Sequence, residues 1–267
     1  MKITSLNLNG IRAAYRKGMT QWLAYENPDI VLMQEVRAND KVLEELIESD
    51  WHLVARHCDI KGRAGVAIMS RFPLKDVSLS LDDEEPVDTG RWIEASVETP
   101  KGNELRLACA YLHAGEINTI KMDQKYAHLE KVTKRLESLK EYSQQTGNSV
   151  VVCGDFNVVR TEKDIKNWKP NHNKSAGVLD EEIAYLEKWF SSGWHDVTRE
   201  FYPDTQGPYT WWSWRGNAYN NDAGWRIDYH ITHGDITDSV KDVQVWRAQE
   251  YVERFSDHSP ITITYDF

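Results

Sequence analysis

Residues 149–157 read Ser-Val-Val-Val-Cys-Gly-Asp-Phe-Asn, and the fold class can be inferred from this stretch. The unbroken apolar run Ser149–Gly154 is typical of a central strand covered on both faces, because a strand with one wet face alternates. Gly154 permits a close backbone approach, and the extended spacing points Asp155 and Asn157 the same way. A carboxylate that can accept a proton from water therefore stands beside an amide that can donate a hydrogen bond. The alternative is an Asx turn that closes the strand.

Strand and helix patterns alternate along the rest of the chain. We expect further strands at 2–9, 29–34, 52–57, 64–70, 74–81, 91–99, 104–112, 209–214, 225–232, 241–246 and 260–265. The longest helical stripe covers 119–142, and shorter stripes surround Trp22, Leu43 and Leu186. This order predicts an α/β fold, a four-layered α/β sandwich of two packed mixed β-sheets flanked by helices. No linker or repeat interrupts it, so we expect one domain over residues 1–267.

Composition limits the classes of protein. Charged residues make up 28% and hydrophobic residues 40%, as in an ordinary globular protein. The net charge of −10 argues against a non-specific nucleic-acid coat protein, but a local groove can still be basic. The acidic run 82–85 is expected to be a solvated loop. Three cysteines without a short-spaced pair, no signal peptide and no membrane-length apolar stretch favour a cytoplasmic protein with no membrane partner.

Two motifs in the first 40 residues place polar side chains at strand ends. In Leu6–Asn9, alternation puts Asn7 and Asn9 on one face, although a strand-end turn would explain the same pattern. Glu35 follows an apolar strand and is a good metal ligand, unless it simply pairs with Arg37.

Two more motifs lie near the end of the chain. Alternation in 225–231 puts Arg226 and Asp228 on one face, and a carboxylate within a strand needs a partner. That partner is either Arg226 or His258, an imidazole that a carboxylate can hold in one tautomer. Asp257 precedes His258 just before the last strand. A site of carboxylates, amides and one histidine suits a hard divalent cation and a phosphate ester, which indicates a metal-dependent phosphodiesterase.

Taken together and in this order, the motifs resemble the endonuclease/exonuclease/phosphatase superfamily, and within it the exonuclease III type of apurinic/apyrimidinic endonuclease. The resemblance covers essentially the full length. The motifs that carry it are Leu6-Asn7-Leu8-Asn9-Gly10-Ile11-Arg12, Gln34-Glu35, Gly90-Arg91, Gly154-Asp155-Phe156-Asn157, Tyr209-Thr210-Trp211, Trp225-Arg226-Ile227-Asp228-Tyr229 and Ser256-Asp257-His258-Ser259-Pro260.

The resemblance implies a metal site and a water-activating pair. Asn7 and Glu35 would hold Mg²⁺ or Mn²⁺, with Asp257 as an outer or second-metal ligand. Asp155 would orient or deprotonate the attacking water, and Asn157 would steady it or the phosphorus.

It also implies the groups that contact the phosphate. Asp228 would orient His258 against the scissile phosphate, and Tyr111 would lie near the leaving oxygen. Arg91 and Lys121 would contact the phosphate backbone.

The implied substrate is double-stranded DNA with abasic sites or 3′ ends. Trp211, Trp225 and Ile227 would build a pocket for a flipped-out sugar, because an aromatic box accepts a residue without its base and excludes a normal nucleotide. Core packing is the alternative for both tryptophans. The expected enzyme is a monomer that cuts 5′ to the lesion, with 3′-to-5′ exonuclease and 3′-end-cleaning activity.

One segment departs from the family pattern. Tyr111 is followed by Leu112-His113-Ala114-Gly115-Glu116, where the family has a Pro and an Asn or Gln before the Gly. His113 and Glu116 could alter metal binding or the balance of the two nuclease activities. Competing interpretations are a non-specific nuclease, a sphingomyelinase, an inositol-phosphate phosphatase and a scaffold that has lost its chemistry.

Overall fold

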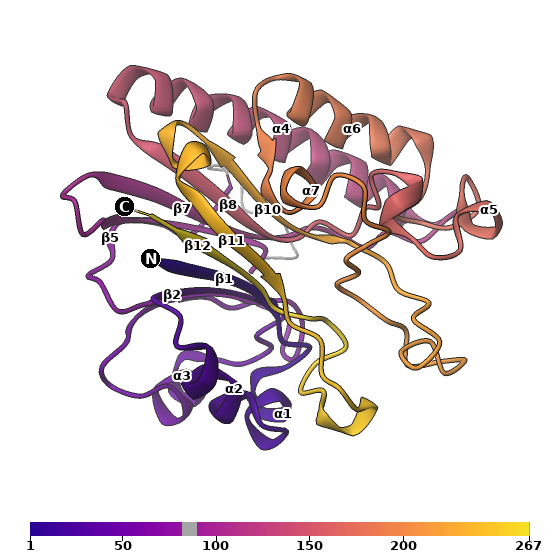
Figure 1. The fold of residues 1–267 in the computed structure, drawn as a ribbon, viewed down its shortest axis with the longest axis horizontal. Coiled ribbons are helices and arrows are strands. Elements are labelled where there is room, and N and C mark those ends of the chain that lie inside the picture. The colour runs from indigo at the N-terminus through magenta and orange to yellow at the C-terminus, as the bar shows by residue number, and fades with distance from the viewer. Residues whose placement is uncertain (82–89, 267) are drawn as a thin grey trace.

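The computed structural model describes residues 1–81 and 90–266, so the acidic run 82–85 lies outside the described residues. Two six-stranded sheets pack face to face, and helices cover the outer face of each (Figure 1). The strands are β1 (Lys2–Asn7), β2 (Ile30–Gln34), β3 (His52–Arg56), β4 (Val66–Ser70), β5 (Lys75–Ser78), β6 (Trp92–Glu98), β7 (Glu104–Tyr111), β8 (Ser149–Asp155), β9 (His195–Asp196), β10 (Asp228–His233), β11 (Val240–Val245) and β12 (Ile261–Tyr265). The predicted four-layered sandwich is confirmed.

The helices lie on both outer faces of this pair of sheets. In Figure 1, α1, α2 and α3 lie below the lower sheet, and α4 and α6 lie above the upper one. The α-helices are α1 (Ile11–Arg16), α2 (Met19–Glu26), α3 (Asp40–Leu46), α4 (Ile120–Thr146), α5 (Trp168–Asn171), α6 (Asp180–Ser191) and α7 (Val197–Phe201), and the 3₁₀ turns are Glu162–Asp164, Asp235–Ser239 and Tyr251–Glu253. No helix within the described ranges is long and apolar enough to cross a membrane.

The apolar run of β8 is buried on both of its faces. Val151 and Cys153 belong to the core between the two sheets, whereas Val150 and Val152 pack in the core shared with α4. This double burial explains why the strand does not alternate. Gly154 lies against β7, since a Cβ there would meet the Ala110 carbonyl oxygen at 1.8 Å.

Strand directions bring the predicted site residues to one edge. Each sheet has one parallel pair, β1–β2 in the order β11-β12-β1-β2-β4-β3 and β7–β8 in the order β5-β6-β7-β8-β10-β9. Asp155 is level with Tyr111 at the ends of β8 and β7. It is also level with Asp228, because β10 is antiparallel and begins where β8 ends. In the other sheet Asn7 is level with Gln34.

The strand predicted at 209–214 is wrong. Trp211 forms two single-residue bridges, one to Trp225 and one to His258. Trp225 precedes β10 and His258 precedes β12, and these two strands belong to different sheets. Trp211 and Trp225 exchange both backbone hydrogen bonds at 2.9 Å. Aromatic residues have a high propensity for strands, but a segment that crosses from one sheet to the other cannot extend along either.

Candidate active site

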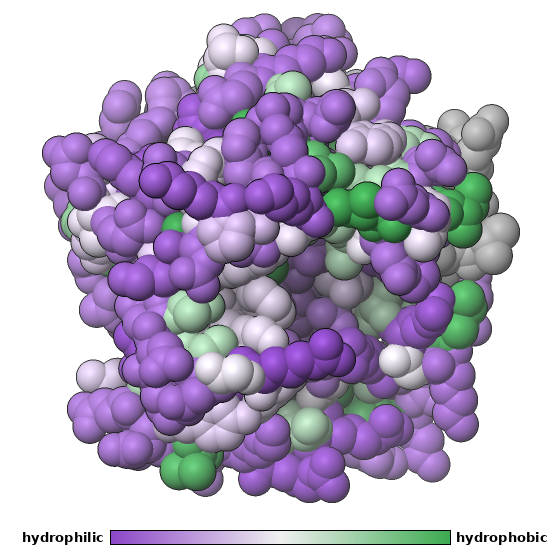
Figure 2. Space-filling model, turned by 90° about the vertical axis from the view of Figure 1, so that its right-hand side faces the viewer, coloured by the Kyte–Doolittle hydropathy of each residue, from purple (hydrophilic) through white to green (hydrophobic). Residues whose placement is uncertain are grey.

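The predicted side chains gather on the side of the molecule toward which β1 runs. Figure 2 looks onto this side and shows a hollow bordered mostly by hydrophilic residues.

Asn7 joins the two sheets at the centre of the site. Its Nδ2 donates to Glu35 Oε1 at 3.1 Å and to Asp155 Oδ2 at 2.9 Å. Its Oδ1 accepts from the Asn9 amide at 3.0 Å. Glu35 also forms an ion pair with Arg37, so the alternative partner considered for Glu35 is present as well. Pairing with Arg37 and a place in the site are therefore compatible.

Asp228 and His258 form a buried pair. His258 Nδ1 lies 2.8 Å from Asp228 Oδ2, and Nε2 lies 3.8 Å from Asp155 Oδ2. Burial alone would lower the pKa of His258, but the charge and hydrogen bond of Asp228 raise it to about 10. His258 is therefore an imidazolium at neutral pH. Arg226 is not the partner of Asp228, because it binds two other aspartates.

The ionised form of Asp155 is disfavoured by its surroundings. Burial and the nearby charge of Asp228 raise its pKa to about 8, although His258 acts in the opposite direction. Its Oδ1 accepts from the Asn157 amide at 2.9 Å, and Asn157 Nδ2 donates to the Leu112 carbonyl at 2.9 Å. The Asx-type turn considered as the alternative is therefore present. Asn157 has a φ of 52°, so the segment is not extended at this residue as the sequence analysis expected.

The donor atoms fit a hard divalent cation. Glu35 and Asp155 each offer a carboxylate oxygen, and these two atoms and a ring nitrogen of His258 lie within 4.8 Å of one another. Because His258 is charged, the two carboxylates and not the imidazolium would hold the ion. Buried carboxylates gathered around a single imidazole leave an excess of negative charge that a cation would offset. Asn7 presents its amide nitrogen to the carboxylates, so it would serve as a ligand with its amide turned.

Asp257 lies apart from that group. Its Oδ1 accepts from Asn9 Nδ2 at 2.8 Å and its Oδ2 accepts from Trp211 Nε1 at 3.2 Å. Asp257 is thus hydrogen-bonded on one side to Asn9, which binds Asn7, and on the other side to Trp211 of the predicted pocket.

Tyr111 and Arg91 stack beside the cluster. The Arg91 guanidinium lies 4.7 Å from the centre of the Tyr111 ring and donates to the Tyr111 carbonyl at 3.4 Å. Burial and the charges of Glu35 and Asp155 raise the pKa of the Tyr111 hydroxyl, so it keeps its proton at neutral pH.

Lys121 is placed differently from the other predicted residues. It is exposed near the start of α4 and forms an ion pair with Glu116 at 2.6 Å. The ring of His113 meets His128 edge-on, with centres 5.1 Å apart. In the segment 112–116, which departs from the family pattern, Glu116 therefore pairs with Lys121 and His113 contacts His128.

Trp211 and Trp225 form an aromatic wall next to His258. Their rings meet edge-on with centres 5.6 Å apart, and the Trp211 ring lies 6.5 Å from the imidazole. Both are partly buried around a small cluster that contains Ile227, whereas Trp212 is almost fully buried in a different cluster. Core packing thus describes Trp212, and Trp211 and Trp225 keep exposed surface.

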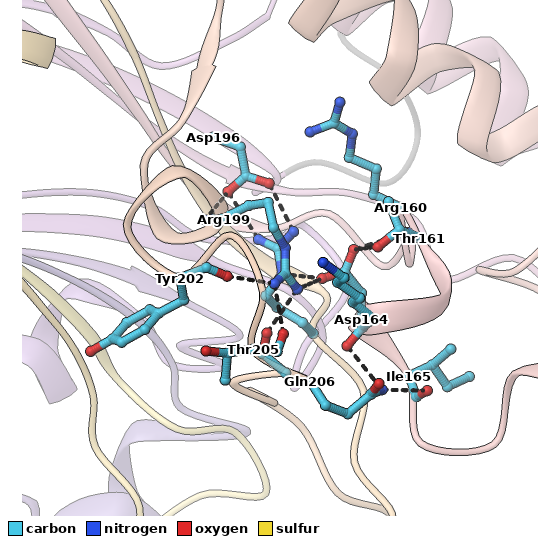
Figure 3. Close-up of polar contacts among 12 residues, drawn as sticks. Arg160, Thr161, Asp164, Ile165, Asp196, Arg199, Tyr202, Thr205 and Gln206 are labelled. Carbon is cyan, nitrogen blue, oxygen red and sulfur yellow. Dashed lines mark hydrogen bonds and ion pairs between the residues drawn. The ribbon is translucent and has the colours of Figure 1, made fainter.

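Next to Trp225 in the sequence, Arg226 belongs to a buried charge network that includes Asp164, Asp196 and Arg199, and Figure 3 shows the surroundings of these last three residues. Arg226, fully buried, donates to Asp164 Oδ1 at 2.6 Å and to both oxygens of Asp196 at 2.9 and 2.8 Å. Arg199 forms an ion pair with Asp164 and donates to the Tyr202 carbonyl at 2.8 Å. The network fixes the backbone on which Trp225, Ile227 and Asp228 lie. Its members are too far apart in sequence for alternation to reveal them.

Sequence reasoning also missed a basic groove beside Glu35. A cavity of about 360 Å³ is lined by ten residues, namely Arg12, Arg37, Ala38, Asn39, His57, Cys58, Asp59, Lys61, Gly62 and Arg63. Four arginines and lysines against one aspartate make the groove locally positive in an acidic chain. Arg37 connects it to the site through its ion pair with Glu35.

Small hydroxyl groups complete the geometry. Thr210 Oγ1 accepts from the amides of Ile227 and Asp228 at 3.1 and 3.2 Å. Ser256 Oγ donates to the Asn7 carbonyl at 2.6 Å. Both residues lie within the motifs quoted above, but the sequence analysis gave neither of them a role.

Comparison with known proteins defines the class. The Endonuclease/Exonuclease/phosphatase family matches residues 4–258, and the chain belongs to this family. It is 30% identical to the exodeoxyribonuclease of Bacillus subtilis, with 98% of each chain covered. It is 31% identical to the DNA repair nuclease APEX1 of Danio rerio, with 98% of this chain and 81% of that one covered.

Solved structures agree with this assignment. A 3′ phosphatase, NExo, from Neisseria bound to a product DNA hairpin superposes with a TM-score of 0.84 at 27% identity, and all of both chains is covered. Together these relatives support a hydrolytic nuclease that acts in DNA repair.

Proposed function

We propose that this chain is a Mg²⁺- or Mn²⁺-dependent nuclease that incises duplex DNA 5′ to abasic sites and also trims and cleans 3′ ends. The observation that carries the abasic preference is the wall of Trp211 and Trp225 beside the imidazole of His258. Flat apolar surface next to a catalytic group accepts a sugar that has lost its base.

The charges of the site suggest the role of each group. His258, charged at neutral pH and held by Asp228, donates from Nε2 to a non-bridging phosphate oxygen. Asp155 accepts a proton from the water that attacks in line, and the amide of Asn157 steadies that water. Tyr111, which keeps its proton, donates to the leaving oxygen.

A divalent cation held by Glu35, with Asn7 and Asp155, would offset charge on the phosphate and the leaving group. The same positive charge would lower the pKa of Asp155, so that more of it is ionised and able to accept a proton at neutral pH. Asp257 is the proposed outer ligand, with Trp211 and Asn9 fixing its orientation.

The basic groove supports binding of a DNA backbone. Arg12, Lys61 and Arg63 line it, and Arg91 stacks on Tyr111 nearby. Local positive potential is what a polyanion requires, whatever the net charge of the chain. For Lys121 we retain a phosphate contact that would have to displace Glu116.

The proposal describes a monomer of one domain over residues 1–267 that works in the cytoplasm. The core between the sheets extends from Ile3 to Tyr265, so both ends of the described chain contribute to one core. All three cysteines are buried free thiols, which is compatible with a reducing compartment.

Replacement of the pocket wall tests the abasic preference. Trp225→Ala should lower kcat/KM for an abasic duplex by about tenfold or more, and it should change 3′ trimming of an undamaged duplex by less than about threefold. Trp51→Ala, the same change next to β3, should leave both rates unchanged. Equal losses on the two substrates for Trp225→Ala would show that the wall does not recognise the lesion.

A further inference from the structure

A fully buried ion pair joins the two long helices behind the site. Lys125 of α4 and Glu182 of α6 are paired, and neither is exposed to solvent. Lys125 stands in the buried stripe of α4 between Met122 and Leu129, where an apolar residue would be expected. A buried charge is costly unless it is paired and fully hydrogen-bonded, so its other partners matter.

Those partners are backbone carbonyls of the site. Lys125 Nζ donates to the Asn157 oxygen at 2.8 Å and to the Ala114 oxygen at 3.1 Å. With Glu182 these acceptors match the three N–H donors of the ammonium group. Ala114 lies in the segment that departs from the family pattern, and Asn157 belongs to the loop that follows β8.

Asn157 needs such support. Its φ of 52° lies in the left-handed region, which asparagine tolerates but which the surroundings must maintain. Its amide binds Asp155, its side chain binds Leu112, and its carbonyl binds Lys125. The lysine is the anchor that comes from outside the two strand-end loops.

Glu182, the partner of Lys125, also binds the turn that precedes α6. Its Oε2 accepts from the amides of Gly177 and Leu179 at 2.6 and 3.1 Å. A Cβ at Gly177 would lie 2.8 Å from the Asn157 oxygen and 3.5 Å from the Trp225 ring. The Asn157 carbonyl is therefore enclosed between the lysine and this turn, and the turn contacts the aromatic wall.

We propose that Lys125 is a positioning residue for the nuclease reaction, which fixes the Asn157 peptide and thereby holds the Asn157 side-chain amide against the attacking water. The inference rests on the role given to Asn157 in the proposed function. Without the ammonium group, the Asn157 peptide can rotate and carry the side chain with it. A displacement of about 1 Å at a reacting centre can lower the rate by about 100-fold.

Three variants separate positioning from folding. Lys125→Met keeps the length of the side chain and removes all N–H donors, so kcat should fall by about 10- to 100-fold with KM within about threefold. Glu182→Gln keeps both lysine–carbonyl bonds, and kcat should fall by less than about threefold. The double variant Lys125→Met/Glu182→Gln has no unpaired buried charge, so its Tm should rise above that of Lys125→Met while its kcat stays as low.

Arg135→Met is the matched control. Arg135 lies on the same helix and pairs at 2.7 Å with buried Glu94 of β6, so its loss should lower Tm and leave kcat unchanged. Recovery of kcat together with Tm in the double variant would overturn the proposal, because Lys125 would then act through stability alone.

A double-mutant cycle with Asn157→Ala tests the path of the effect. If Lys125 acts through the Asn157 side chain, Lys125→Met should cost less than about threefold more in an Asn157→Ala background. Independent, multiplying losses would contradict the proposal. Every rate is measured on an undamaged 3′ end as well as on an abasic duplex. A lack of abasic preference would contradict the proposed substrate, but the effect of Lys125→Met could still be measured on the undamaged 3′ end.

Discussion

At the scale of single residues, the site depends on a histidine that is kept charged. His258 lies between two carboxylates, and Asp228 raises its pKa from 6.5 to about 10 even though burial opposes this. The raised pKa means that the pair stabilises the fold fully below about pH 6.5 and loses that contribution as pH rises through about 10.

Asp228→Asn should lower both the pKa of His258 and the rate. Removal of the Asp228 charge leaves burial opposed only by the charges of Asp155 and Asp257, so the pKa of the imidazole should fall from about 10. We expect turnover at pH 8 to fall by about 100-fold or more. Titration of the His258 ring by NMR in EDTA checks the cause. An unchanged imidazole pKa in the variant would contradict this account of the pair.

Asp155 shows the opposite relation between stability and activity. Its pKa is raised from 3.8 to about 8 by burial and by Asp228, so its ionised form costs stability in full above about pH 8 and nothing below about pH 3.8. Asp155→Asn keeps an acceptor for the Asn157 amide and removes the charge.

In EDTA at pH 9 we expect Asp155→Asn to have a Tm at least equal to that of the wild type. In Mg²⁺ its turnover should be lower by about 100-fold or more. Divalent cation should raise the Tm of the wild type more than that of the variant, because the variant loses a ligand charge. Thermal unfolding with and without metal measures both effects. A clearly lower Tm in EDTA would show that Asp155 is not under electrostatic strain.

At the scale of elements, the sequence predicts correctly the strands and helices whose pattern of apolar residues is strong. The double-sided burial of β8 and the long stripe of α4 were predicted from apolar pattern alone, and both are confirmed. The segment 209–214 was misassigned because its aromatic residues favour strands. Its backbone hydrogen bonds to Trp225 on one side and to Asp257 and Ser259 on the other hold it between the sheets. Local pattern cannot show that a segment bridges two sheets.

The same limit explains Arg226. Alternation placed it with Asp228, but the fold brings Asp164 and Asp196 to it from other elements. Although burial would raise it, Arg226 and Arg199 hold the pKa of Asp164 at about 2, below its usual 3.8. This depressed pKa gives stability that is present above about pH 3.8 and lost as pH falls toward 2.

Asp164→Asn should therefore remove part of the acid sensitivity of the fold. Between pH 5 and pH 2 the wild type should lose about 2 kcal/mol more free energy of unfolding than the variant. Asp204→Asn, which removes an exposed ion pair with Lys163, should follow the wild type. Urea unfolding at several pH values makes the comparison. Parallel wild-type and Asp164→Asn curves would rule out this carboxylate as the acid-sensitive group.

At the scale of the whole molecule, an acidic chain has to bind a polyanion. The basic groove next to Glu35 provides the means, and it was invisible in the sequence because Arg12, Arg37, Lys61 and Arg63 come from three separate segments. The burial of Lys125 was missed for a related reason, because a lysine in an amphipathic helix is expected on its exposed face. The motifs predicted which side chains gather in the carboxylate cluster, because each lies at or next to an end of a strand.

Neutralising the groove should weaken DNA binding with little effect on the chemical step. Lys61→Gln/Arg63→Gln should raise KM for duplex DNA by about tenfold at physiological salt, and the dependence of log KM on log salt should become shallower by about two phosphate contacts. The change in kcat should stay within about threefold. Lys101→Gln, in the β6–β7 turn at the opposite edge, should change neither. An unchanged salt slope would remove the groove from the DNA path.

The central claim is that this centre uses a divalent cation to cut DNA beside a missing base. The most direct test is cleavage of a duplex with one abasic analogue, next to an undamaged duplex, in Mg²⁺, Mn²⁺ or EDTA. The account predicts metal-dependent incision immediately 5′ to the lesion, faster than any trimming of the undamaged control. Trimming of 3′ ends without preference for the lesion, release of 3′ phosphate alone, or cleavage that persists in EDTA would contradict it.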